Sequence, residues 1–322
     1  MAPTPPPRIA VVSGGVGAAR FLRGLLDVVP ADDVAAIVNT GDDTVLHGLT
    51  IAPDLDTITY TLAGAIDPER GWGLGGETWQ AMEALARYTD VRPDGSAAAT
   101  TWFNLGDRDL ATHLYRTARL AEGATPTVVA DEIRRAWGIG IRLLPMTDGR
   151  QPTVLELASG GEVSFQDYFV RLRHGVPVRG VRFVADGATP TDAVVDALRS
   201  AATVVIAPSN PIVSIGPIRN LPGLEDLLIE RRERTVAVSP IVGGAALKGP
   251  ADHMLAELGH EPSVVGVARL YAPIAGALVI DPVDAALAAD VEAAGMRAVV
   301  QPSIMSTPEI AADLARAVLA AV

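Results

Sequence analysis

The hydrophobic pattern of the chain begins with a short apolar run that stops at glycines. Residues 9–13 (Ile-Ala-Val-Val-Ser) precede the glycine-rich segment 14–17, and residues 18–29 then repeat apolar side chains at helical spacing. A second apolar run, residues 34–38, ends at Asn39. Buried parallel strands are near-continuous apolar runs, whereas amphipathic helices carry apolar residues every three to four positions. The pattern therefore predicts a strand, a glycine loop, a helix and a second strand in that order.

Strand-like and helix-like segments alternate along the rest of the chain, and residues 40–56 form a Gly- and Asp-rich loop. Further helices are predicted at residues 57–63, 78–88, 108–121, 126–137, 221–230, 251–258 and 308–322. Further strands are predicted at residues 141–144, 153–157, 178–184, 203–207, 235–238, 264–267, 277–280 and 298–300. We expect one Rossmann-like α/β domain over residues 1–322, a doubly wound and mostly parallel sheet built from both ends of the chain. A largely helical insertion is expected at about residues 57–138.

Composition and charge narrow the function classes. Only 4% of residues are aromatic and 49% are hydrophobic, so aliphatic side chains must fill the core, as in a parallel sheet covered by Ala-rich helices. The net charge is −12, and the only dense basic run, residues 231–234, ends a predicted helix, where cations suit the helix dipole. We therefore expect no nucleic-acid partner. The absence of cysteine excludes disulfides, thiolate catalysis and thiolate metal sites.

Targeting and membrane segments are not expected. The N-terminal residues contain no apolar stretch of the signal-peptide kind, and no run of about 18 uninterrupted apolar residues occurs. The sequence thus predicts a soluble, cytoplasmic protein with no membrane partner.

The glycine loop Ser13-Gly14-Gly15-Val16-Gly17 is the first candidate site. Backbone amides at a helix N-terminus favour an anion, and glycines let a phosphate approach closely; the alternative is a tight turn with no ligand. A dinucleotide fingerprint requires Gly or Ala where Arg20 stands, and an acid where the second strand ends in Asn39. A nicotinamide oxidoreductase is therefore disfavoured. A Walker-type loop is excluded because no Gly-Lys-Ser/Thr follows.

Four aspartates follow the second strand: Asp42, Asp43, Asp54 and Asp56. They should emerge at the same carboxyl edge of the sheet as the glycine loop. Mg²⁺ is commonly held by one or two carboxylates together with substrate phosphates, so the aspartates are candidate metal ligands. The alternative is that they cap helices or form turns.

Further polar residues follow a predicted helix start and two more strands. Arg108, flanked by Asp107 and Asp109, is a candidate for gripping a phosphate or carboxylate, or else part of an internal ion pair. His113 is more typical of a packed helix histidine than of a base. The strand-end loops at residues 207–211, with Ser209 and Asn210, and 239–244, with Lys248 soon after, offer small polar groups to a nucleotide.

Taken in order, these segments resemble the 2-phospholactate transferases of coenzyme F-420 biosynthesis, some of which are phosphoenolpyruvate transferases. The resemblance rests on an ordered set of motifs, each weak alone. They are residues 13–17 (Ser-Gly-Gly-Val-Gly), 38–43 (Val-Asn-Thr-Gly-Asp-Asp), 53–57 (Pro-Asp-Leu-Asp-Thr), 70–73 (Arg-Gly-Trp-Gly), 105–113 (Leu-Gly-Asp-Arg-Asp-Leu-Ala-Thr-His), 144–148 (Leu-Pro-Met-Thr-Asp), 165–169 (Phe-Gln-Asp-Tyr-Phe), 207–216 (Ala-Pro-Ser-Asn-Pro-Ile-Val-Ser-Ile-Gly) and 239–243 (Ser-Pro-Ile-Val-Gly).

The resemblance implies a Rossmann-like, usually dimeric, Mg²⁺-dependent transferase. Its donor would be a guanosine diphosphate ester of a three-carbon acid, and its acceptor the ribityl hydroxyl of an 8-hydroxy-5-deazaflavin. That hydroxyl would take the phosphorylated acid (2-phospholactyl or phosphoenolpyruvyl) and release GMP. Which of 2-phospholactate, phosphoenolpyruvate and 3-phosphoglycerate is carried stays open. The alternative is a non-catalytic nucleotide-sugar-binding regulator of the same superfamily, which would lack the Gly-Asp-Arg-Asp and Phe-Gln-Asp segments.

The resemblance also implies roles for individual residues. Asp43 and Asp56 would bind the metal, with Asp54 supporting or replacing one of them, and Asp56 would also orient the attacking hydroxyl. The substrate-binding residues would be Gly14, Gly15, Gly17, Asn39, Asp56, Arg108, Ser209 and Asn210, of which Asp56 and Arg108 would be catalytic. Within that set, the glycines would meet phosphate, Ser209 and Asn210 the guanosine side, and Arg108 the charged substrate group.

Overall fold

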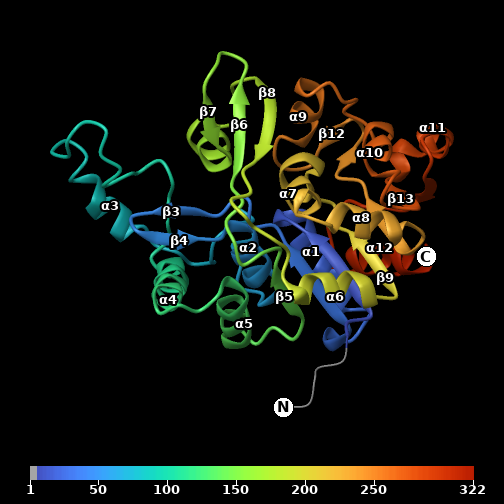
Figure 1. The fold of residues 1–322 in the computed structure, drawn as a ribbon, viewed down its shortest axis with the longest axis horizontal. Coiled ribbons are helices and arrows are strands. Elements are labelled where there is room, and N and C mark those ends of the chain that lie inside the picture. The colour runs from blue at the N-terminus through green and yellow to red at the C-terminus, as the bar shows by residue number, and fades with distance from the viewer. Residues whose placement is uncertain (1–5) are drawn as a thin grey trace.

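The computed structural model describes residues 6–322 and is built around a seven-stranded sheet (Figure 1). All its strand pairs are parallel, in the order β14-β13-β10-β9-β1-β2-β5. The strands are β1 (Ile9–Ser13), β2 (Val34–Val38), β5 (Arg142–Pro145), β9 (Thr203–Ile206), β10 (Thr235–Val238), β13 (Ala277–Ile280) and β14 (Arg297–Val300). The predicted α/β class with a parallel sheet is confirmed.

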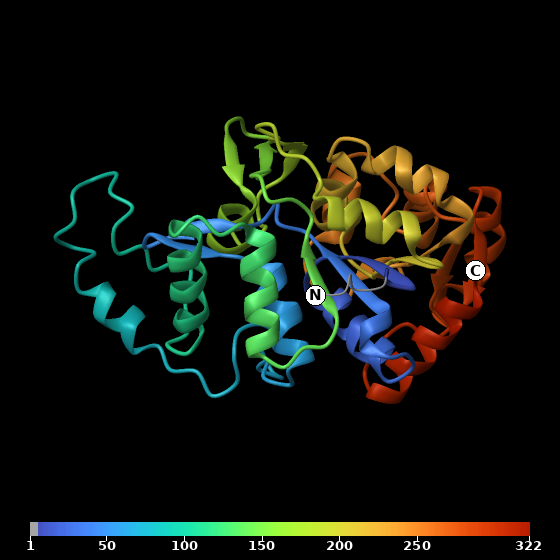
Figure 2. The same ribbon diagram turned by 60° about the horizontal axis from the view of Figure 1, so that its bottom comes forward.

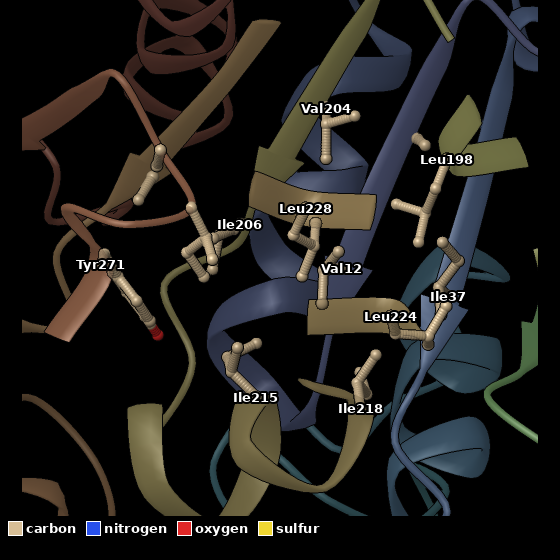
Figure 3. Close-up of a cluster of buried hydrophobic side chains, with 14 of the residues drawn as sticks. Val12, Ile37, Leu198, Val204, Ile206, Ile215, Ile218, Leu224, Leu228 and Tyr271 are labelled. Atoms are coloured by element: carbon tan, nitrogen blue, oxygen red, sulfur yellow. The ribbon is translucent and has the colours of Figure 1, made fainter. Parts of the chain in front are cut away.

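Alternate residues of each central strand supply two separate cores. Val12, Ile37 and Ile206 face a cluster completed by helices on one side (Figure 3), whereas Val11 and Val205 face the cluster on the other side. Successive strand side chains point to opposite faces, so a strand covered on both faces must be apolar throughout. This is why β1, β2, β9, β10 and β13 are buried at every position.

Helices cover both faces of the sheet. Over residues 6–322 the α-helices are α1 (Gly15–Leu26), α2 (Pro53–Leu62), α3 (Gln80–Ala86), α4 (Asp109–Ala121), α5 (Pro126–Ala136), α6 (Asp192–Ser200), α7 (Gly216–Asn220), α8 (Leu224–Glu230), α9 (Ala251–Glu257), α10 (Val264–Tyr271), α11 (Ala288–Ala293) and α12 (Pro308–Ala320). Figure 2 shows α4 and α5 side by side, with the segment around α3 projecting beyond them. Of the stretch predicted as an insertion, α2 packs on α1 and α5 on β5, so both lie against the main body of the fold.

Three small sheets complete the fold. β7 (Glu162–Ser164), β6 (Thr153–Leu157) and β8 (Val178–Phe183) form an antiparallel sheet, and β11 (Ile241–Val242) and β12 (Ala245–Ala246) a hairpin. The segment predicted as a plain loop contains another hairpin, β3 (Thr44–Leu46) and β4 (Leu49–Ile51). Strands β6 and β8 were predicted, whereas β7 and the strands of the two hairpins have too few residues to stand out in the sequence.

The topology brings distant loops together. β1 lies between β2 and β9, so the chain order reverses at this point of the sheet. In doubly wound folds ligands bind outside the carboxyl ends of the strands at such a switch point. The loops that follow β1, β2, β9 and β10 all leave at this edge.

One predicted strand is wrong, and three helices were missed. Residues 264–267 form the first turn of α10, whose N-cap Ser263 accepts hydrogen bonds from the amides of Val265 and Gly266 (both 3.2 Å). A short apolar run does not distinguish a buried helix from a strand. Helices α6, α7 and α11 were not predicted at all.

In residues 6–322 no helix is both long and apolar enough to cross a membrane. The prediction about the N-terminal segment falls partly on residues 1–5, which lie outside the described residues.

Candidate active site

A cavity of about 720 Å³ opens at the switch point. Its wall combines the glycine loop after β1, the first turn of α2 and the loops after β9 and β10. Of the residues predicted for the site, Gly14, Gly15, Gly17, Asp54, Asp56, Ser209 and Asn210 line it. The cavity therefore brings together most of the predicted site.

The glycine loop is shaped by close contacts. Gly15 begins α1 with a positive φ of 72°, a conformation that favours glycine. A Cβ on Gly17 would lie 2.1 Å from the carbonyl oxygen of Pro208, so only glycine lets α1 meet the loop after β9. At Gly15 and Gly17 the first turn of α1 thus meets the cavity without a side chain, which lets a phosphate approach closely.

Ser209 fastens this loop to β9. Its Oγ donates to the Gly14 carbonyl (2.7 Å) and accepts from the Gly14 amide (3.2 Å). The next residue, Asn210, uses Oδ1 to cap the turn that follows, accepting from the amides of Ile212 (2.9 Å) and Val213 (3.3 Å). Both residues line the cavity while holding its wall in shape.

Asp54 lies beneath the glycine loop, held by Asn39. The Asn39 Nδ2 donates to Asp54 Oδ2 (3.0 Å), and its Oδ1 accepts from the Gly41 amide (2.8 Å). Asn39 is fully buried at the end of β2 and does not line the cavity. Asp54 and Asp56 both lie in the first turn of α2, whose N-cap is Ala52, so neither caps that helix. Asn39 therefore orients Asp54.

The carboxylates of Asp54, Asp42 and Asp43 lie near one another, and their negative charge is not fully balanced by neighbouring groups. Burial raises the pKa of Asp54 to about 6, although hydrogen bonds from Asn39 and the Gly15 amide act to lower this pKa. The pKa of Asp42 is raised by burial and by the carboxylates of Asp54 and Asp43, and that of Asp43 is raised chiefly by burial. Within residues 6–322, Oδ1 of Asp42 and of Asp43 are buried oxygens without a hydrogen-bond partner.

Oxygens of this kind fit a hard divalent cation. Such a cation would satisfy the unpartnered oxygens and offset the cost of burying three neighbouring carboxylates. Asp42 and Asp54 line the main cavity, whereas Asp43 lines a small pocket behind it, beside Arg116.

Asp56 is already neutralised by Arg116. The two Nη atoms of Arg116 bind the two carboxylate oxygens, one at 3.1 Å and the other closer, and both residues are buried. His113 Nδ1 lies 3.2 Å from the same guanidinium, and its Nε2 lies 3.2 Å from Asp109 Oδ2. Asp56, Asp109 and His113 could together hold an ion, since their ligand atoms lie within 4.8 Å of one another, but Arg116 occupies this carboxylate. A cation at Asp56 would have to share the carboxylate with Arg116 or displace that side chain.

Three residues of this buried cluster were missed by the sequence analysis. Arg116 was not singled out, Asp109 was considered only as a neighbour of Arg108, and Tyr60, which donates to Asp109, was not considered. The spacing of Asp109, His113 and Arg116 along α4 places them on one helix face, which was the available indication.

Arg108 lies outside the cavity. Its side chain is exposed and donates to the Gly75 carbonyl, and its amide donates to Glu77 Oε2 (2.8 Å). Asp107 accepts from the amides of Gln80 and Ala81 (both 3.0 Å). These two residues tie the start of α4 to residues 75–81, and the contact of Arg108 with substrate stays a prediction.

Three cationic side chains line the mouth of the cavity: Arg20, Arg70 and Lys248. Arg70 pairs with Asp67 (2.9 Å) and stacks on Trp72 and Trp79. Arg20, on α1, is exposed and was considered earlier only as a departure from the dinucleotide fingerprint. The cavity thus has an acidic floor and a basic rim.

Comparison with known proteins finds relatives over nearly the whole chain. The family model described as 2-phospho-L-lactate transferase CofD matches residues 9–309. A protein named phosphoenolpyruvate transferase from Streptomyces griseus is 43% identical over 317 residues, covering 97% of each chain. A protein of the same name from Nocardia farcinica is 42% identical over 328 residues, covering 99% of this chain and 96% of the relative.

Solved structures support the fold. Protein BH3568 of Bacillus halodurans superimposes with a TM-score of 0.62 at 16% identity, covering 98% of this chain and 100% of that one. A second structure of that protein, described as a member of the UPF0052 family, gives a TM-score of 0.61. At this identity the likeness concerns the fold alone.

Proposed function

Because this chain belongs to the CofD 2-phospho-L-lactate transferase family, we propose that it is a transferase of coenzyme F-420 biosynthesis that uses a guanosine diphosphate ester as donor. The acceptor is the ribityl hydroxyl of a deazaflavin, and GMP is the product that leaves. The names of relatives 39–43% identical favour phosphoenolpyruvate as the three-carbon acid.

The observation that carries this proposal is the pairing of two features in one cavity. The first turn of α1, which has no side chain at Gly15 and Gly17, suits a diphosphate, and the buried carboxylates of Asp42 and Asp54 line the same cavity. The added Cβ of Gly14 would lie only 3.0 Å from Asp54 Oδ2, so anion and cation sites adjoin. A ligand that brings phosphates and a divalent cation together satisfies both.

The reaction forms a bond from the acceptor hydroxyl oxygen to the phosphorus that bears the three-carbon acid. The bond from that phosphorus to the oxygen of GMP breaks. Transfers of this type need positioning and charge neutralisation rather than a covalent enzyme intermediate. Mg²⁺, when bound, would supply positive charge against the phosphate oxygens.

The chain's own residues do the positioning. The amides of the α1 first turn bind phosphate, with the loop held in place by Ser209. Asp54 and Asp42 hold the cation, with the unpartnered oxygen of Asp43 close behind. Asp56 lines the cavity with its carboxylate fixed by Arg116, so it can accept a hydrogen bond from the attacking hydroxyl.

The test is an assay of purified protein with the deazaflavin, Mg²⁺ and, separately, each guanylylated acid. GMP release and the mass of the deazaflavin product are both measured. We expect the phosphoenolpyruvyl donor to turn over fastest and GMP release to require the acceptor. Absence of product with all three donors would overturn the proposal.

A further inference from the structure

We propose that Lys248 binds the diphosphate of the donor together with the glycine loop, an inference that rests on the proposed function. Lys248 is the only lysine of the chain, since the other 25 of its 26 basic residues are arginines. This single ammonium lies at the mouth of the cavity.

Lys248 reaches across the cavity mouth. It follows the β11–β12 hairpin, in the C-terminal half of the chain, and its Nζ lies 3.5 Å from the carbonyl oxygen of Arg70. A Cβ placed on Gly71 would be 2.5 Å from that Nζ and 4.0 Å from Cγ1 of Val16, in the first turn of α1. The ammonium therefore lies beside residues 70–71 and close to the anion-binding end of α1.

The ammonium has no carboxylate partner. Across residues 6–322 Lys248 forms no salt bridge, and its one hydrogen bond, to the Arg70 carbonyl, is long. Arg70, by contrast, is held by Asp67 and two tryptophan rings. A cation that is directed over a cavity yet unpaired is available to an anionic ligand.

The opposite wall indicates what kind of anion this is. Asp42 is buried in the cavity wall with an unpartnered oxygen, which a cation at the floor of the cavity would satisfy. Lys248 supplies a second positive charge at the rim. A diphosphate bound to a divalent cation matches this arrangement, because the cation can meet Asp42 while the phosphate oxygens meet Lys248. A lone carboxylate brings no cation. Gly71 leaves room for this ammonium, since a Cβ at position 71 would lie only 2.5 Å from Nζ.

The first test measures GDP binding by calorimetry, with Mg²⁺ present, for the wild type, Lys248→Met and Lys248→Arg. Lys248→Met, which keeps the stem without the charge, should weaken GDP about tenfold to a hundredfold, the usual loss for a charge-assisted hydrogen bond. Lys248→Arg should weaken it less. The matched control is Arg199→Met, which removes an exposed cation on α6 and should leave binding unchanged. Equal affinity of Lys248→Met and wild type would overturn the proposal.

The second test uses the uniqueness of the lysine. Reductive methylation with ¹³C-formaldehyde labels Lys248 and the α-amino terminus, giving one lysine signal and one internal reference. GDP and inorganic pyrophosphate should each shift the lysine signal and leave the reference in place. A shift with pyrophosphate but not with GDP would support Lys248 while refuting the guanosine donor. If neither ligand moves the lysine signal, Lys248 does not bind the diphosphate, whatever the transfer assay shows.

Discussion

Arg116 reaches from α4 to α2 and binds both carboxylate oxygens of Asp56, one of them at 3.1 Å. Both side chains are buried, and Asp56 forms part of the cavity wall. The carboxylate that the sequence places closest to the chemistry is therefore fixed in position by an internal cation. This pair makes the segment around α4 part of the site.

Removing Arg116 should destabilise the protein strongly. Arg116→Met would leave Asp56 buried and unpaired, which typically costs about 3–5 kcal/mol. Arg119→Met, one turn further along α4, breaks partly exposed pairs with Glu132 and Glu122 and should cost about 1 kcal/mol or less. Urea unfolding measures the free energy of unfolding of both variants. Similar losses would show that the buried pair stabilises the fold no more than the partly exposed pairs.

Adding one methyl group to the glycine loop should also destabilise the fold. Gly17→Ala would force Cβ to within 2.1 Å of the Pro208 carbonyl oxygen, where only backbone movement could relieve the clash. We expect a loss of about 1–3 kcal/mol or more, together with weaker GDP binding. Gly175→Ala, whose Cβ would meet nothing closer than 3.5 Å, is the control and should be nearly neutral. A Gly17→Ala variant as stable as this control would be inconsistent with the described contact.

Asp42 should be required for stabilisation by Mg²⁺. A cation that binds only the folded state raises Tm by mass action, and Asp42→Asn removes one of its carboxylates. Without Mg²⁺ the variant should melt at a higher temperature than wild type at neutral pH, because a buried charge is gone. With Mg²⁺ its Tm should change little. Asp313→Asn, on the exposed face of α12, should keep the wild-type response. A full Mg²⁺ response in Asp42→Asn would exclude Asp42 as a ligand.

Stability in the absence of metal should fall as pH rises. The pKa of Asp54 is raised from 3.8 to about 6, and those of Asp42 and Asp43 are also raised. A raised folded-state pKa means that the protonated form is favoured in the fold. The stability that the protonated carboxyl groups contribute is fully present below the unfolded-state pKa. It is lost as pH rises through the folded-state pKa.

Mg²⁺ should reverse this trend, because it binds the deprotonated carboxylates. Its contribution to the free energy of unfolding should therefore grow between about pH 5 and pH 7. Urea unfolding at a series of pH values, with and without Mg²⁺, measures the difference. A Mg²⁺ effect of the same size across this range would contradict a site made of these three aspartates.

The start of the fold was predictable because local and global preferences agree there. The apolar run of β1, the glycines and the helical spacing of α1 all indicate one unit, and the structure contains it. The run at residues 264–267 was misassigned because four apolar residues fit a buried strand or helix equally. The capping serine, Ser263, was the local feature that favoured the helix.

The site was predictable in part for the same reason. Loops that follow parallel strands must meet at one edge, so the glycine loop, Asp54 and Ser209 could be grouped from the sequence. Arg116 could not, because its partner Asp56 is 60 residues away and no local pattern marks a buried ion pair. Lys248 was noted only as a neighbour of a strand-end loop, since nothing local shows that its ammonium reaches α1.

The central claim is that a diphosphate and a divalent cation meet between the α1 first turn and the aspartates. A crystal grown with GDP and Mn²⁺, which shares the oxygen-ligand preference of Mg²⁺ and is located by anomalous scattering, tests it directly. We predict a Mn²⁺ peak in contact with Asp54 and Asp42, and phosphate oxygens on the amides of residues 16–17. A Mn²⁺ peak among Asp56, Asp109 and His113, with the first turn of α1 empty, would contradict the claim.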